Sequence, residues 1–326
     1  MDYITEEIIN WLAEDGNPVI RYLVMRDFPS YFSVPALSQV TQSTQVRTIL
    51  DSASENIAGN PIHYDLWYHG SVWAFAELVE CGLTIENSVV AKTAEYITTH
   101  AQLASGGFTM NWAPPCEAAG WTGNILYYLL AAGFQGDAVH HAAKWLALFQ
   151  RTDGGWNLSP ISGVKDALSL SLFRKSGKTS DHEGESSLLS TVSCGRALTL
   201  YKSLFGNCPC DIPKAADFVL TKKRLLRKKQ HGGELYLSNS RFHSLSYPVL
   251  CQQDILSSLL FVAEAGKLAD ERASEPFNVV MRKRLSNGKF FCESREAGTL
   301  PAKYGWKLKT PDKWITLQSL RLMKYA

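Results

Sequence analysis

The sequence predicts an all-α fold, an α/α toroid of about twelve helices in which an inner ring of helices is enclosed by an outer ring. Stretches of apolar residues with the helical period recur along the chain, and most of them end at a glycine. No long alternation of apolar and polar residues, the pattern of a half-buried strand, interrupts them. The helices are therefore expected to form a single domain over residues 1–326.

The N-terminal part, residues 1–60, is predicted to hold helices that show only the helical rhythm of the later repeats. Asn17 is a suitable N-cap, and Pro18 suits the first turn of the helix that it begins. The predicted helices cover residues 5–16, 17–28 and 38–56.

Repeat-like helix pairs are predicted over residues 66–325, where the rhythm is regular. The first helices of the pairs cover residues 66–81, 122–132, 187–204 and 251–265. Each ends at a glycine that can adopt the left-handed conformation which closes a helix, namely Gly82, Gly133, Gly206 and Gly266. The second helices start after the predicted N-caps Asn87, Asp137, Asp211 and Asp270. A final helix over residues 313–325 is expected to open at Thr310-Pro311.

The clearest repeat motif ends the segment of residues 137–156. Trp145, Leu146 and Phe149 lie at helical spacings and form one apolar stripe. Gln150 falls at the helix end, where its amide can bond carbonyls that lack a helical partner or the turn that follows. A turn through Gly154-Gly155 then returns Trp156 to the helix.

This spacing resembles the Gln-Trp repeat of triterpene cyclases, which is related to the repeat of the protein prenyltransferase β subunits. Three weaker copies follow the same pattern. One copy ends at Gly106-Gly107-Phe108 with Ala101 at the Gln position, and another opens at Lys214 with Lys223 there. The last copy closes on Gly288-Lys289-Phe290.

The resemblance implies a terpenoid-cyclase-like or prenyltransferase-like enzyme that acts on a hydrophobic, isoprenoid-type substrate in an aromatic-lined central cavity. An alternative is a non-catalytic toroid that binds a hydrophobic small molecule or a peptide, and a further alternative is a carbohydrate-active α/α toroid. The alternatives stay open because a fold does not determine an activity.

Residues at the starts of the predicted inner helices are the candidates for substrate binding, because aromatic faces attract carbocations and apolar chains. These candidates are Trp67, Tyr68, His69, Trp73, Cys116, Trp121, His243, Tyr247, Trp306 and Trp314. The Asp-x-Asp-Asp motif of proton-initiated cyclases is absent. Its nearest counterpart is residues 251–254, in which only Asp254 is a carboxylate. Asp254 is therefore the predicted catalytic acid, with N-terminal stabilisation of its helix as the alternative role.

No cofactor is predicted, although the residue types leave zinc or magnesium open. Prenyltransferases hold zinc with Asp, Cys and His, and Cys251, Asp254 and His243 offer the same types without the family's local order. Cys208-Pro209-Cys210 lacks a second cysteine pair, so no metal site is predicted there.

Composition restricts the partners. The chain has a net charge of +2 and a pI near 8.1, too balanced for nucleic acid as a main partner. The basic run Lys222–Lys229 is interpreted as a solvated helix end, with peripheral contact to an anionic membrane as the alternative. The acidic start and the scattered cysteines predict a cytoplasmic protein with reduced thiols, and the sequence sets no oligomeric state.

Overall fold

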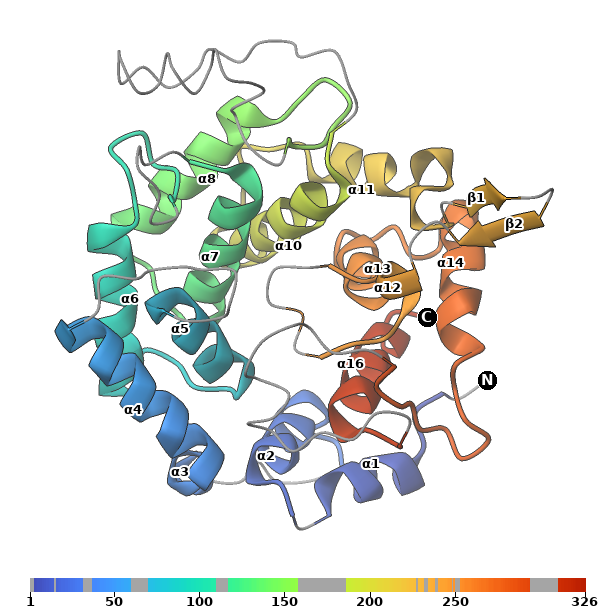
Figure 1. The fold of residues 1–326 in the computed structure, drawn as a ribbon, viewed down its shortest axis with the longest axis horizontal. Coiled ribbons are helices and arrows are strands. Elements are labelled where there is room, and N and C mark those ends of the chain that lie inside the picture. The colour runs from blue at the N-terminus through green and yellow to red at the C-terminus, as the bar shows by residue number, and fades with distance from the viewer. Residues whose placement is uncertain are drawn as a thin grey trace. The chain divides into compact units, whose positions relative to one another are not determined.

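The computed structural model describes residues 3–14, 16–31, 37–59, 70–109, 117–157, 186–226, 228–231, 234–237, 240–247, 249, 253–293 and 310–326. Within these ranges the chain is mostly helical, with one short hairpin (Figure 1). The all-α prediction is confirmed, whereas the arrangement in two rings stays a prediction. The chain divides into two compact units: unit 1 holds Met1–Ile49, Glu80–Gly82 and Leu220–Ala326, and unit 2 holds Leu50–Val79 and Leu83–Val219.

Unit 2 is built from helices. Its helices are most of α4 (Thr44–Gly59), α5 (Ser71–Glu80, except its last residue), α6 (Ser88–His100), α7 (Ala119–Ala131), α8 (Asp137–Phe149), α10 (Leu188–Phe205) and α11 (Ile212–Leu220, except its last residue). Helix α7 packs against both α10 and α8. Gly123 of α7 allows the close approach, because a Cβ there would lie 2.7 Å from the backbone nitrogen of Cys194 in α10.

Unit 1 joins the two ends of the sequence. Its elements are α1 (Glu6–Ala13), α2 (Pro18–Asp27), α3 (Ser38–Gln42), the start of α4, the 3-10 helix η1 (Thr221–Leu226), β1 (Lys228–His231), β2 (Glu234–Leu237), α12 (Ser240–His243), α13 (Ile255–Glu264), α14 (Glu271–Met281) and α16 (Lys313–Met323). Helix α13 packs against α14 and α16, and α16 also packs against α2. The antiparallel hairpin pairs Lys228 with Leu237 and His231 with Glu234.

Most predicted helix boundaries agree with the structure. Gly82, Gly133, Gly206 and Gly266 all have positive φ, between 73° and 88°. The side chains of Asn87 and Asp270 cap α6 and α14. These boundaries are predictable because a terminating glycine and a capping side chain act on their own turn.

Four boundary predictions are wrong. Residues 38–56 are not one helix, because extended backbone at Ser43 separates α3 from α4. Gly136, not Asp137, is the N-cap of α8, and Asp312 caps α16, so that Pro311 lies before the helix. The basic run Lys222–Lys229 does not end an α-helix, since α11 ends at Leu220 and the chain continues into η1 and β1.

The repeat is clearer in the structure than in the sequence, and its register differs by one residue in the first copy. Gln150 donates from Nε2 to the carbonyl oxygens of Gly154 (3.0 Å) and Asp211 (2.9 Å), which links the end of α8 to the start of α11. Gln102 does the same at the end of α6, donating to Gly106 (2.9 Å) and Ala138 (2.8 Å). The assignment of Ala101 to the Gln position is therefore wrong.

The aromatic residue of each copy is fixed to the next helix by a threonine. The backbone N–H of Phe108 donates to Thr122 Oγ1 (2.9 Å), and that of Trp156 donates to Thr191 Oγ1 (3.2 Å). In unit 1 the N–H of Phe290 donates to Thr316 Oγ1 at 3.0 Å. All three rings are fully buried, so these three copies each end in an aromatic anchor with its backbone donor satisfied.

Candidate functional site

The predicted site residues fall into three groups. Trp67, Tyr68, His69, Cys116 and Trp306 lie outside the described residues. Trp73 and Trp121 belong to unit 2, where Trp73 is buried in α5 and Trp121 is half-buried in α7. His243, Tyr247, Asp254 and Trp314 belong to unit 1.

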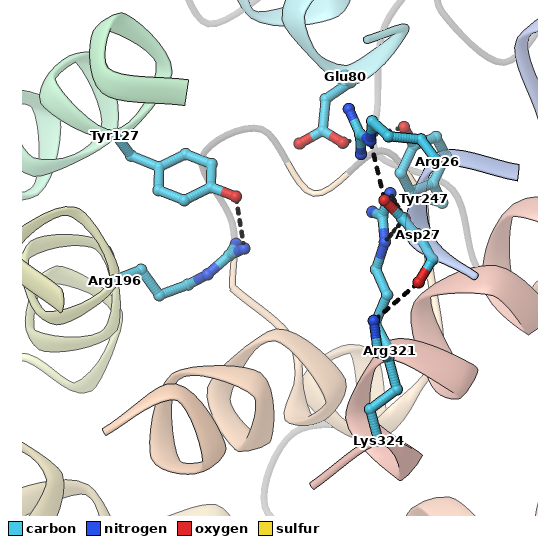
Figure 2. Close-up of polar contacts among 8 residues, drawn as sticks. All are labelled: Arg26, Asp27, Glu80, Tyr127, Arg196, Tyr247, Arg321 and Lys324. Atoms are coloured by element: carbon cyan, nitrogen blue, oxygen red, sulfur yellow. Dashed lines mark hydrogen bonds and ion pairs between the residues drawn. The ribbon is translucent and has the colours of Figure 1, made fainter. Parts of the chain in front are cut away.

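Tyr247 and Trp314 form a stacked aromatic pair. Tyr247 lies in the segment between α12 and α13, and Trp314 lies in the first turn of α16. Their ring centroids are 4.5 Å apart with an interplanar angle of 14°, and both side chains are buried. The Tyr247 hydroxyl donates to Glu80 Oε2 at 3.1 Å, so the polar end of the ring is fixed as well (Figure 2).

Arg321 adds a charged network to this pair. It follows Trp314 by two helical turns on the same face of α16. Its Nε and a terminal nitrogen contact Asp27 Oδ2 at 2.7 and 2.6 Å, and Arg26 Nε donates to Asp27 Oδ1 at 2.9 Å. Lys324 Nζ donates to the Asp27 carbonyl oxygen at 2.8 Å (Figure 2).

The electrostatics tie these groups together. Burial alone would raise the pKa of Asp27, but the charges and hydrogen bonds of Arg321 and Arg26 outweigh it and lower that pKa. Burial alone would lower the pKa of Arg321, but the Asp27 and Glu80 carboxylates raise it. An ionised carboxylate and guanidinium therefore lie beside the aromatic pair. We call Asp27, Glu80, Tyr247, Trp314 and Arg321 the Tyr247 cluster.

Asp254 is the N-cap of α13. Its Oδ1 accepts from the Ser257 N–H (2.7 Å) and its Oδ2 from the Ser246 N–H (3.3 Å), while the Asp254 N–H donates to Ser257 Oγ (2.9 Å). This reciprocal arrangement is a capping box, in a residue that is 3% exposed. Both carboxylate oxygens thus accept backbone donors at a helix N-terminus, and catalysis by Asp254 stays a prediction.

Among the described residues, the structure does not bring the predicted zinc ligands together. Nε2 of the buried His243 ring donates to the Leu225 carbonyl oxygen at 2.8 Å. Cys251 lies outside the described residues. Among the described residues, no group of three or more His, Cys, Asp or Glu side chains could hold a metal ion.

Unit 2 has a polar pair of its own that the sequence analysis missed. Arg196 of α10 donates to the Tyr127 hydroxyl of α7 at 2.9 Å, and its guanidinium carbon lies 4.4 Å from the Tyr127 ring centroid (Figure 2). Arg196 and Arg321 share a signal that could have found them, since each is a lone charge within a run of apolar and small residues.

A groove of about 380 Å³ lies elsewhere in unit 1, between η1 and α14. Leu220, Leu225, Leu226 and Pro276 give it apolar walls, and charged side chains line it beside them. None of the predicted site residues lines this groove.

Comparisons with known proteins show no family. No model of a known protein family matches the sequence, and no curated protein matches it. The solved structures that resemble the chain include a protein from Actinoplanes, at 12% identity and a TM-score of 0.32, which covers 86% of this chain and 99% of its own. They also include the apo form of the type II terpene cyclase MstE from Scytonema, at 12% identity and a TM-score of 0.33, over 89% of this chain and 98% of its own. Likeness at this level carries no argument about activity.

None of the helices in the described ranges is both long enough and apolar enough to cross a membrane.

Proposed function

We propose that the chain binds a hydrophobic small molecule of the isoprenoid type, with the Tyr247 cluster at one end of the binding site. The observation that carries the proposal is the stack of Tyr247 on Trp314 at 4.5 Å, ending in a hydroxyl bonded to Glu80. The two buried rings would form a rigid apolar wall of the binding site, and the charged groups beside them suit a polar or anionic head group.

Charge supports the orientation of such a ligand. Arg321 is bonded to Asp27, and Arg26 reaches the same carboxylate with a side chain that is 43% exposed. Arg26, Arg321 and Lys324 carry three positive charges against the two carboxylates of Asp27 and Glu80, so an anionic group near Arg26 would be favoured. A prenyl diphosphate therefore fits this site better than a neutral prenyl alcohol does.

The test is a titration of the protein with farnesyl diphosphate, geranylgeranyl diphosphate and farnesol, in which binding is measured by tryptophan fluorescence and by calorimetry. Tyr247→Ala should weaken binding by about tenfold or more, because it removes one of the two stacked rings. Tyr247→Phe should bind nearly as the parent does, because it keeps the stack and loses only the bond to Glu80.

A matched control is Tyr96→Ala, since Tyr96 stacks on His100 at 4.3 Å in α6 of the other unit. This control should leave the affinity unchanged, and circular dichroism should show that every variant keeps its helical content. Equal affinity in Tyr247→Ala and Tyr96→Ala would contradict the proposal. Binding of an oligosaccharide in place of every prenyl ligand would favour the carbohydrate-active alternative.

Catalysis by Asp254 is a second proposal and needs a separate test. If Asp254 protonates a bound prenyl substrate, Asp254→Asn should keep binding and lower turnover by about a hundred- to ten-thousand-fold. If Asp254 only caps α13, the change should cost at most about 1 kcal/mol of stability and leave turnover within a factor of about two. The capping box favours the second outcome and therefore a binding protein over an acid-catalysed cyclase.

A further inference from the structure

The groove between η1 and α14 in unit 1 lies where the repeat departs from its own pattern. In three copies a glycine comes five to seven residues after the helix end and lies against the next helix, namely Gly106, Gly154 and Gly288. After α11, which ends at Leu220, residues 221–231 contain no glycine and begin with η1. Proteins break their own local rules mainly at functional sites, so a site is expected at this junction.

Leucines stand where the other copies have the glycine of the turn. Leu225 and Leu226 of η1 line the groove together with Leu220, and none of the three is more than 4% exposed. Pro276 of α14 lines it as well and is buried. The groove therefore has an apolar floor, and its volume of about 380 Å³ is within the range of small-molecule sites.

The other lining side chains are charged and exposed, and they belong to the first two turns of α14. Glu271 and Glu275 are one turn apart, so their carboxylates are neighbours on the helix surface. Arg272 is bound by Asp270, with Nε 2.8 Å from Oδ1 and Nη2 2.6 Å from Oδ2. This two-pronged pair cancels the charge of Arg272, so the two glutamates give the rim a net negative charge.

These two features together select the chemistry of a ligand. Arg224 of η1 is not a lining residue, since it is 5% exposed and donates from Nη1 to the Thr221 carbonyl oxygen at 3.0 Å. An ammonium group offers three N–H donors to two neighbouring carboxylates, and an alkyl chain suits a floor of leucines. A carboxylate on the same chain would meet like charge, and an alcohol would form no ion pair.

We propose that this groove binds a small primary amine with an apolar chain, whose ammonium group pairs with Glu271 and Glu275. The chain lies on the floor formed by Leu225 and Leu226. No residue of the Tyr247 cluster lines the groove, so this inference is independent of the proposed prenyl ligand.

The test is a calorimetric titration of the full chain with octylamine, octan-1-ol and octanoate. Octylamine should bind at least about tenfold more tightly than the other two, because only the amine pairs with the rim. The double variant Glu271→Gln, Glu275→Gln should bind octylamine about tenfold more weakly and octan-1-ol as the parent does. The control Glu95→Gln changes an exposed glutamate of α6 in unit 2 and should leave every affinity unchanged.

A second measurement tests the floor and the location without a substitution in the core. Each methylene added between hexylamine and octylamine should tighten binding by about two- to fourfold. An alkylamine that carries a diazirine should label peptides of residues 221–226 and 271–281 on irradiation. Equal affinity for octylamine in the parent and the double variant, or labelling confined to other segments, would overturn the proposal. Binding of a peptide with leucine and lysine side chains, without binding of octylamine, would overturn it as well.

Discussion

Trp156 should be one of the most stabilising side chains of unit 2, because its indole has two roles. The ring is 0% exposed, and its Nε1–H donates to the Leu146 carbonyl oxygen at 2.8 Å. Leu146 lies in the last turn of α8, where carbonyl groups lack helical donors. Trp156→Ala therefore removes core packing and a helix cap together and should lower the free energy of unfolding by about 3–5 kcal/mol.

Trp156→Phe separates the two roles. Phenylalanine keeps much of the buried ring and leaves the Leu146 carbonyl without its donor, so the expected loss is about 1–3 kcal/mol. The control is Leu148→Ala, since Leu148 is in the same helix and 71% exposed, and it should change the stability by no more than about 0.5 kcal/mol.

The measurement is urea unfolding followed by far-ultraviolet circular dichroism, with binding of the prenyl ligands measured on the folded fraction. Affinity should be unchanged, because Trp156 anchors a repeat and belongs to no part of the Tyr247 cluster. A Trp156→Ala variant within about 1 kcal/mol of the parent would refute the argument, since a fully buried tryptophan cannot be removed at that cost. Loss of affinity without loss of stability would show that Trp156 is part of the binding site.

Three further predictions follow from the described contacts. Gly154→Ala should lower the free energy of unfolding far more than Gly206→Ala does. Both glycines have positive φ, but a Cβ at Gly154 would lie 2.5 Å from the Lys214 carbonyl oxygen, whereas nothing lies within 4 Å of a Cβ at Gly206. The expected loss for Gly206→Ala is about 1–2 kcal/mol. The pKa of Asp27 is lower in the folded than in the unfolded chain, so its contribution to the free energy of unfolding is present above pH 3.8 and is lost as the pH falls through the folded pKa. Asp27→Asn should therefore have a lower melting temperature at neutral pH, and its melting temperature should fall less below pH 3.8 than that of the parent. Thermal melting should show one cooperative transition of a mainly helical protein, whereas separate transitions would mean that the two units fold independently.

The repeat was predictable from sequence wherever its signal is local. The turn depends on the positive φ of Gly154 and on the buried ring of Trp156, and both residue types can be recognised in the sequence. The sequence predicts the wrong register for the first copy, because the aromatic residue that starts its spacing lies inside α6. The helix ends two residues before Gln102, and the spacing that is kept is from the glutamine to the glycine of the turn. Aligning the copies on Gly106 and Gly154 would have placed Gln102 opposite Gln150.

The Tyr247 cluster was only half predictable. Tyr247 and Trp314 were expected in a site because they are aromatic and lie near helix starts. Asp27 and Glu80 come from the ends of α2 and α5, far away in sequence, and only tertiary packing brings them to α16. Asp254 shows the converse difficulty, because an Asp before an apolar helix has the same sequence pattern whether it donates a proton or caps the helix.

The connections between helices also give the N-terminal segment a place in the repeat. In unit 2, Gln102 bonds the carbonyl of Ala138 at the start of α8, and Gln150 bonds that of Asp211 just before α11. In unit 1, Arg284 occupies the corresponding position after α14 and donates to the Tyr3 carbonyl oxygen at 3.1 Å, just before α1.

The glycine in the turn of each of these copies also lies against the next helix of the repeat. A Cβ at Gly106 or Gly154 would meet the backbone of His141 in α8 or of Lys214 in α11, and a Cβ at Gly288 would meet the side chain of Ile8 in α1. Trp11 of α1 is also contacted by the ammonium groups of Lys289, beside that glycine, and of Lys313 in α16. Helix α1 therefore stands to α14 as α8 stands to α6 and α11 to α8. The N-terminal segment shows only a helical rhythm in its sequence. In the structure, α1 supplies the next helix that the turn after α14 contacts, and in this sense it continues the repeat.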